Sequence, residues 1–108
     1  MQYHQGRPYA ESPDDEIVLF DGLPAEPKAA AIAFLRVELA PVADEVRAAI
    51  HKDPANWIAP YHFHWGMGVR NRLRQAGYGE ETFGICNLDD VYVHLIEASM
   101  RDPEASHA

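Results

Sequence analysis

The sequence predicts a mainly α fold: a compact bundle of three to four helices with an extended N-terminal arm or one short strand. Between residues 28 and 51, apolar side chains recur at steps of three and four, which is the spacing of one helix face. Residues 61–76 have a similar rhythm and end at Gly77, a residue suited to the left-handed conformation that closes many helices. With 47% apolar and 24% charged residues, the 108-residue chain has the composition and length of one globular domain.

The first 22 residues are predicted to form an arm ahead of the helical domain. Residues 1–16 are polar, contain two prolines and show no periodicity, so they are expected to be extended or mobile. Residues 16–20 are apolar, and they are β-branched and aromatic enough for one short strand or for an apolar anchor lying on the helices. The helical domain is predicted over residues 23–102, and a disordered tail over residues 103–108.

One kinked helix or two abutting helices are predicted over residues 28–51. The apolar stripe keeps its phase through Pro41, which removes a backbone hydrogen bond and clashes with the preceding turn. The helix therefore either kinks there or gives way to a second helix at Ala40. The stripe consists of Ile32, Leu35, Leu39, Val42, Val46 and Ile50.

The last helix has a well-specified start. Residues 77–87 contain three glycines and are expected to form a loop. Asn87 is a good N-cap, and Asp89 and Asp90 fall in the first turn, where the helix dipole favours anions. These three residues are predicted to have structural roles, in capping and in an ion pair.

The net charge of −8 is distributed unevenly along the chain. Residues 1–27 sum to −5 and residues 77–108 to −6, whereas residues 28–76 sum to +3. Such a field repels nucleic acid and anionic membranes at long range. We find no membrane-spanning apolar run, no secretory signal and no disulfide partner for the lone Cys86, so a cytoplasmic protein without membrane partners is expected.

The segment 61–78, YHFHWGMGVRNRLRQAGY, is the most unusual part of the sequence. It places two histidines, a tryptophan, two glycines and an Arg-Asn pair in a predicted helix, although several of these groups are costly to bury or weaken a helix. Gly66 and Gly68 indicate the close approach of another backbone. The candidate ligand- or partner-binding residues are His62, His64, Trp65, Arg70, Asn71 and Arg74.

No metal site, cofactor or catalytic centre is predicted. Residues two apart on a helix point about 200° from one another, so His62 and His64 could share an ion only in an extended stretch. His62 is instead expected to form a hydrogen bond in or beside the core, with His64 exposed. The sequence has no nucleophile elbow or phosphate loop, and helix capping accounts for Asp89 and Asp90.

The arginines of this segment have competing interpretations. Arg70 and Asn71 have the donors to bind a phosphate or carboxylate. The favoured alternative is an intramolecular pair between Arg70 and a carboxylate of the last helix, where the candidates are Asp89, Asp90 and Glu97. The row from Arg70 to Arg74 could contact nucleic acid, but its arginines wind around the helix and accompany no recognised binding motif, so a solvated face is favoured.

The pattern HF-x-x-GM-x-x-RN, followed by a helix headed by two aspartates, resembles a small bacterial and phage-associated domain of unknown function. Its positions here are His62, Phe63, Gly66, Met67, Arg70, Asn71, Asp89 and Asp90. The resemblance covers roughly residues 23–99 and departs from the family between Arg72 and Asn87, where family members carry a tryptophan-containing segment. It implies a helical fold and the importance of these residues, but no activity.

The predicted function is that of a small cytoplasmic, non-catalytic interaction or accessory module. It would bind a protein partner through the face from His62 to Arg74 and the glycine-rich loop after it, with the phage or mobile-element association that the resemblance implies. The alternatives are a small anionic ligand or nucleotide bound by His62, Arg70 and Asn71, and a nucleic-acid contact through the Arg70–Arg74 helix. A homodimer is expected if the aromatic side chains leave an exposed patch. The residues of such a patch would be Trp57, Trp65 and Tyr78.

Overall fold

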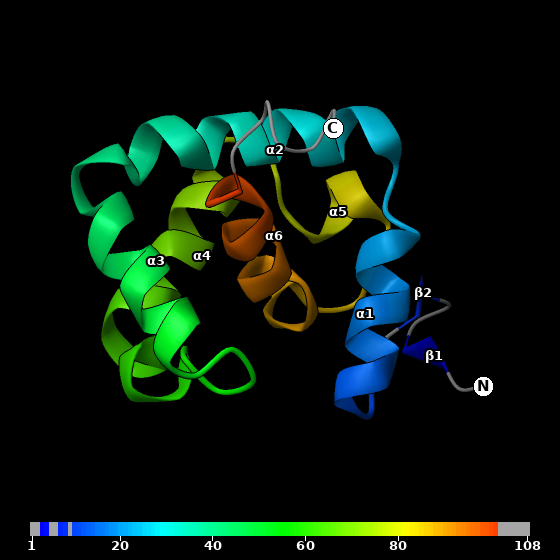
Figure 1. Ribbon diagram of the computed structural model, residues 1–108. Helices are drawn as coiled ribbons and strands as arrows, with labels where there is room; N and C mark the ends of the chain where they lie inside the picture. Colours follow the sequence, from blue (N-terminus) through cyan, green and yellow to red (C-terminus); the bar gives the residue numbers. More distant parts are fainter. Residues whose placement is uncertain (1–2, 5–6, 9, 102–108) are drawn as a thin grey trace, which may run out of the picture.

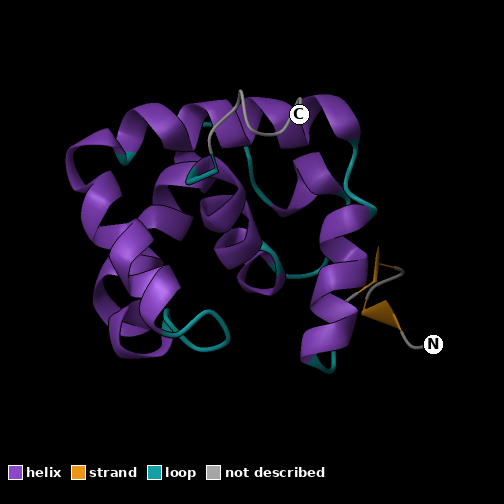
Figure 2. Cartoon of the chain, in the orientation of Figure 1, coloured by secondary structure: helices purple, strands orange, loops and turns teal. Residues whose placement is uncertain are grey.

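The computed structural model describes residues 3–4, 7–8 and 10–101, and within them the chain is mainly helical, which confirms the predicted fold class (Figures 1 and 2). The α-helices are α1 (Pro13–Asp21), α2 (Ala25–Glu38), α3 (Ala43–Lys52), α4 (Met67–Gln75), α5 (Glu80–Phe83) and α6 (Tyr92–Ser99). Two short strands, β1 (Tyr3–His4) and β2 (Arg7–Pro8), pair antiparallel near the N-terminus. The tail predicted over residues 103–108 lies outside the described residues.

Helix α6 is the centre of the fold (Figure 1). Helix α2 runs across it, α1 and α5 lie towards one end of α2, and α3 and α4 lie towards the other. On α6, Tyr92, Leu95 and Ile96 are at most 1% exposed. Burying each such side chain contributes about 1.5–3 kcal/mol, so the packing of α6 against the other helices makes a large contribution to the stability of the fold. Among the described residues, no helix is long and apolar enough to cross a membrane.

Residues 16–20 belong to helix α1, so the predicted short strand is wrong. Ser12 begins the helix by accepting a hydrogen bond from the Asp15 amide, Pro13 occupies the first turn, and three acidic residues there favour the positive helix end. Leu19 and Phe20 pack against the core, as the anchor alternative expected, while Val18 is exposed. The capping signal outweighed the β propensity of the apolar run.

The segment around Pro41 contains two abutting helices, which is one of the two predicted alternatives. Helix α2 ends at Glu38, a 3₁₀ turn spans Ala40–Val42, and α3 starts at Ala43. The predicted stripe faces inwards across the break. Its buried members are Leu35, Leu39 and Val46, and Ile32, Val42 and Ile50 pack partly buried against them.

Residues 61–76 do not form the single α-helix that was predicted. A 3₁₀ turn spans Ala59–Tyr61, a π-helical turn spans His62–Gly66, and α4 follows. The Met67 amide donates to the carbonyl of His62, five residues earlier, so the turn holds one more residue than an α-helical turn. Helix α4 is closed, as predicted, at Gly77 with φ +93°.

The glycine-rich segment 77–87 is not a simple loop, because it contains the short helix α5. Phe83 is 3% exposed and holds this helix to the core, and Gly84 ends it with φ +68°. Asn87 caps the next segment as predicted, but Leu88–Asp90 form a 3₁₀ turn and α6 begins only at Tyr92.

Candidate functional site

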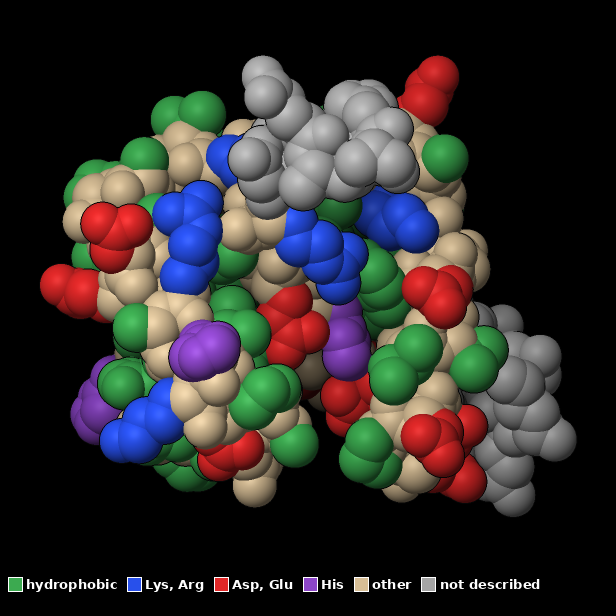
Figure 3. Space-filling model, viewed as in Figure 1, with side chains coloured by type: hydrophobic (Ala, Val, Ile, Leu, Met, Phe, Trp, Pro, Cys, Tyr) green, Lys and Arg blue, Asp and Glu red, His purple; other side chains and the backbone are tan. Residues whose placement is uncertain are grey.

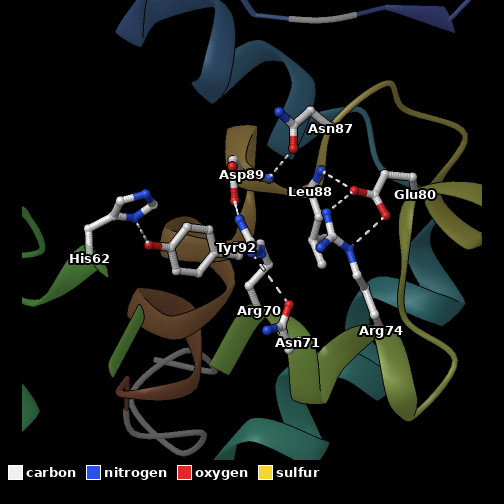
Figure 4. A network of polar contacts seen from close by, with 9 residues as sticks. All are labelled: His62, Arg70, Asn71, Arg74, Glu80, Asn87, Leu88, Asp89 and Tyr92. Carbon is white, nitrogen blue, oxygen red and sulfur yellow. Dashed lines mark hydrogen bonds and ion pairs between the residues drawn. The ribbon is translucent and has the colours of Figure 1, made fainter. Parts of the chain in front are cut away.

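Arg70 joins α4 to the turn that leads into α6 (Figure 4). Its Nη1 donates to Asp89 Oδ1 at 2.8 Å, and its side chain is only 13% exposed against 33% for Asp89. Nη2 lies 3.4 Å from Asn71 Oδ1, within reach of a weak hydrogen bond. The structure thus realises the intramolecular pair that the sequence favoured, and this pair connects two elements that are 19 residues apart.

Arg74 makes the second link of this network, to Glu80 of α5. Its Nε and Nη2 reach the two carboxylate oxygens at 3.1 and 2.5 Å, and Glu80 also accepts the Leu88 amide at 3.0 Å. The hydrogen bond from Arg74 is the main reason that the pKa of Glu80 falls to about 2. Glu80 therefore stays ionised and holds the glycine-rich segment against both α4 and the start of α6.

His62 makes the third link, to Tyr92 of α6. Its Nδ1 lies 2.5 Å from Tyr92 Oη, and burial raises the pKa of this phenol to about 12, so it remains protonated at neutral pH. Gly66 permits this contact, because a Cβ there would lie 2.6 Å from Tyr92 Oη. His62 is half-buried and His64 exposed, as predicted, but Gly68 has open space where its Cβ would be.

The residues at the start of α6 have separate tasks. Asn87 Oδ1 accepts the Asp89 amide at 3.0 Å, which is the predicted cap. Asp90 does not cap α6: its Oδ2 accepts the amide of Ala10 at 3.0 Å and so attaches the N-terminal segment. Burial raises the pKa of Asp90. Asp89 thus forms an ion pair with Arg70, whereas Asp90 attaches the N-terminal segment.

Helix α4 does not present a free basic stripe. Besides the pairs of Arg70 and Arg74, Arg72 Nη1 lies 2.5 Å from Glu38 of α2. Within the part of the chain that the structure describes, no group of three or more His, Cys, Asp or Glu side chains is placed to hold a metal ion.

Of two adjoining hollows, the first lies between α3 and the π turn, and the second lies between α4 and the end of α2 with the 3₁₀ turn that follows it; together we call them the α3–α4 groove. The first has a volume of about 220 Å³ and is mostly apolar; the second, of about 300 Å³, extends along α4. Both are lined by Val42 and Trp65. Tyr61 lines the first and is 46% exposed, and Gly68 lines the second.

The exposed aromatic residues of this region were not anticipated. Trp57 is buried, and Trp65 and Tyr78 are half-buried, so these three do not make an exposed patch. The large exposed aromatics are instead Tyr61 and Phe63, at 46% and 78%. On a helical wheel Phe63 lies on the same side as Arg70, away from Val69 and Leu73, so its exposure is compatible with helical spacing, whereas the π turn has no signature in a constant period. Pro60, which lies just before the π turn, was the sequence signal that a regular α-helix does not run through this segment.

Comparisons with protein-family models, with curated proteins and with solved structures found no match for this chain.

Proposed function

We propose that this protein is a non-catalytic interaction module that binds a protein partner through the α3–α4 groove and the His62–Arg74 face beside it. The observation that carries the proposal is the groove itself, where apolar hollows meet at Trp65 and open to solvent beside Tyr61. Partner proteins commonly lay the apolar face of a helix into such a groove. A π turn next to it fits this role, because π-helical turns are frequent at functional sites.

The chemistry of the groove favours a partner segment that is apolar and flanked by a basic side chain. Val42, Val46 and Trp65 would contact the apolar side chains. Glu45 also lines the groove, and within residues 10–101 it has no hydrogen-bond or ion-pair partner. A lysine or arginine beside the apolar anchors would complement this carboxylate and the net charge of −8.

The alternative of an anion bound by His62, Arg70 and Asn71 is less well supported. The forked donors of Arg70 face Asp89 and Asn71, and His62 faces Tyr92, so an anion would have to displace the contacts that join α4 to α6. Partner binding in the groove requires no such displacement.

Gly68 offers a sharp test of the groove. A side chain there meets nothing within 4 Å of its Cβ, so Gly68→Leu should fill the groove while preserving the fold. The matched control is Gln75→Leu, which adds the same side chain at an exposed position of α4. Peptides would be selected against the wild-type protein from a random displayed library, and the binding of selected peptides followed by tryptophan fluorescence.

We expect the selected peptides to carry apolar residues at helical spacing, and G68L to weaken their binding by about tenfold or more while Q75L leaves it unchanged. Sedimentation of the unliganded protein would show whether a second copy fills the groove instead. If no peptide is enriched and the protein is monomeric, or if G68L binds the peptides as the wild type does, the proposal fails.

A further inference from the structure

Another hollow lies where α2, α3 and the end of α6 meet, and its lining is basic whereas that of the α3–α4 groove is mostly apolar. It has a volume of about 190 Å³, and its charged lining consists of Arg36, Arg47 and Arg101. We call it the arginine pocket. Figure 3 shows Lys and Arg side chains gathered over this part of the surface, although the protein as a whole is acidic. Among the described residues that line it there is no aspartate or glutamate.

Two of these guanidinium groups have donors to spare. Within the described residues, Arg36 forms no hydrogen bond or ion pair, and its Nε is enclosed without a partner. Arg101 is exposed, and its side chain also forms no hydrogen bond or ion pair within that range. An enclosed guanidinium donor without an acceptor is costly. Arg70 Nε is enclosed in the same way, but Arg70 pairs with Asp89 through Nη1, whereas Arg36 has no such pair within the described residues, so its remaining donors are left for an anion in the pocket.

Arg47 gives the pocket its shape. Its Nε donates to the Met100 carbonyl at 3.0 Å, which ties α3 to the end of α6. Its Nη1 lies 3.6 Å from Asp44, a contact made in solvent because that carboxylate is fully exposed. Stabilising the negative end of α6 would need only one such cation, so the helix dipole accounts for Arg47 but not for Arg36 and Arg101.

A larger hollow adjoins the arginine pocket. It has a volume of about 450 Å³ and shares Arg47, Met100 and Arg101 with it, and it is further lined by Ile50 and Pro54. Glu97 also lines it, but this carboxylate accepts a hydrogen bond from Trp57 Nε1 at 2.8 Å. The space allows a bound anion to carry an uncharged group on one side.

We propose that the arginine pocket binds a phosphate-type oxyanion, free or as a phosphate monoester. Guanidinium groups match the geometry of phosphate oxygens with paired donors, and three of them from separate elements can surround one group. The chain itself also carries anionic groups nearby in the sequence, because the carboxylates of Asp102 and Glu104 lie one and three residues after Arg101. The test therefore has to separate a diffusible anion from these carboxylates.

The test is calorimetric titration with pyrophosphate at constant ionic strength. Arg36→Gln and Arg101→Gln should each weaken binding by about tenfold or more, since each removes charge-assisted hydrogen bonds. The affinity of Arg36→Lys for pyrophosphate should lie between those of the wild type and of Arg36→Gln, because lysine keeps the positive charge but lacks the paired donors of the guanidinium group. Arg72→Gln is the matched control: it removes the same charge at a position paired with Glu38, and should not change the affinity. Melting temperatures would verify that each variant is folded.

The double variant Asp102→Asn, Glu104→Gln shows whether the anion bound in the arginine pocket is diffusible or belongs to the chain itself. If the two carboxylates occupy the pocket, this variant binds pyrophosphate more tightly than the wild type; if the ligand is only diffusible, the affinities agree. The proposal is overturned if neither protein binds pyrophosphate, or if R72Q weakens binding as much as R36Q. Gly68→Leu should bind pyrophosphate normally, so failure of the groove and failure of the pocket are distinguishable.

Discussion

The arginines of α4 and those of the arginine pocket differ in their surroundings: each arginine of α4 has a carboxylate partner, whereas within the described residues only Arg47 of the pocket has one, the fully exposed Asp44. Arg70, Arg72 and Arg74 are close in sequence, yet they point to different elements and each meets its own carboxylate. The pocket arginines come from positions 36, 47 and 101, and the fold gathers them around one hollow without an acidic lining residue. Arginines that are neighbours in sequence therefore need not form a basic surface, and distant ones can.

The largest expected difference between the two sets is in stability. Arg70→Met should lower the free energy of unfolding by about 2–4 kcal/mol, because it leaves the partly enclosed Asp89 without its partner. Arg36→Met should leave it unchanged within about 0.5 kcal/mol or raise it slightly, since no hydrogen bond or ion pair is lost within the described residues and the enclosed, unpartnered Nε is removed. Urea unfolding of both variants measures this difference.

A double variant sharpens the same experiment. Replacing both partners, Arg70→Met with Asp89→Leu, should recover much of the lost stability, because no charge is then left alone. Equal losses for R70M and R36M would contradict the distinction between a structural and an available arginine.

A smaller effect is expected in acid at Glu80. Its pKa is lowered from an ordinary value of 4.5 to about 2, so ionised Glu80 favours the folded state. This contribution, about 1–3 kcal/mol, is complete above pH 4.5 and is lost as the pH falls towards 2. Glu80→Gln should therefore be less stable at neutral pH, and the difference from the wild type should shrink in acid. Unfolding curves measured across this range check it; a constant difference would show that Arg74 does not hold the carboxylate.

The smallest effect is expected at Arg72. Its side chain is 66% exposed, so Arg72→Gln should cost about 0.5 kcal/mol or less, and added salt should remove the difference. Unfolding at low and high salt measures both. A large, salt-independent loss would mean that the pair with Glu38 is as structural as the pair of Arg70.

Individual residues show where sequence reasoning succeeded. The inward positions of Leu35, Leu39 and Val46 follow from helical spacing alone. Pro41 marked the interruption, but the choice between a kinked helix and two abutting helices was made only by the structure. The left-handed Gly77 was also predictable, because few other residues adopt that conformation cheaply. In α1, the cap formed by Ser12 and Pro13 was visible in the sequence, but the β-branched run after it was given too much weight.

The candidate site was less predictable. The partner of Arg70 could be narrowed to three carboxylates, but the choice of Asp89 depends on how the turn before α6 packs on α4. The π turn at residues 62–66 could not be predicted, because it has no signature in a constant helical period. The arginine pocket had no sequence pattern at all, because its residues lie on three separate segments.

By itself, the sequence determined the helical class, most of the inward-facing positions and some of the helix ends, such as those near Pro41 and Gly77, because these depend on interactions between residues a few positions apart. The tertiary structure alone decided which arginines are neutralised and which remain available, because a charge pair depends on the position of elements that are distant along the chain. It also decided where the surface is hollow, since a groove is what remains after α3 and α4 have packed on the same core.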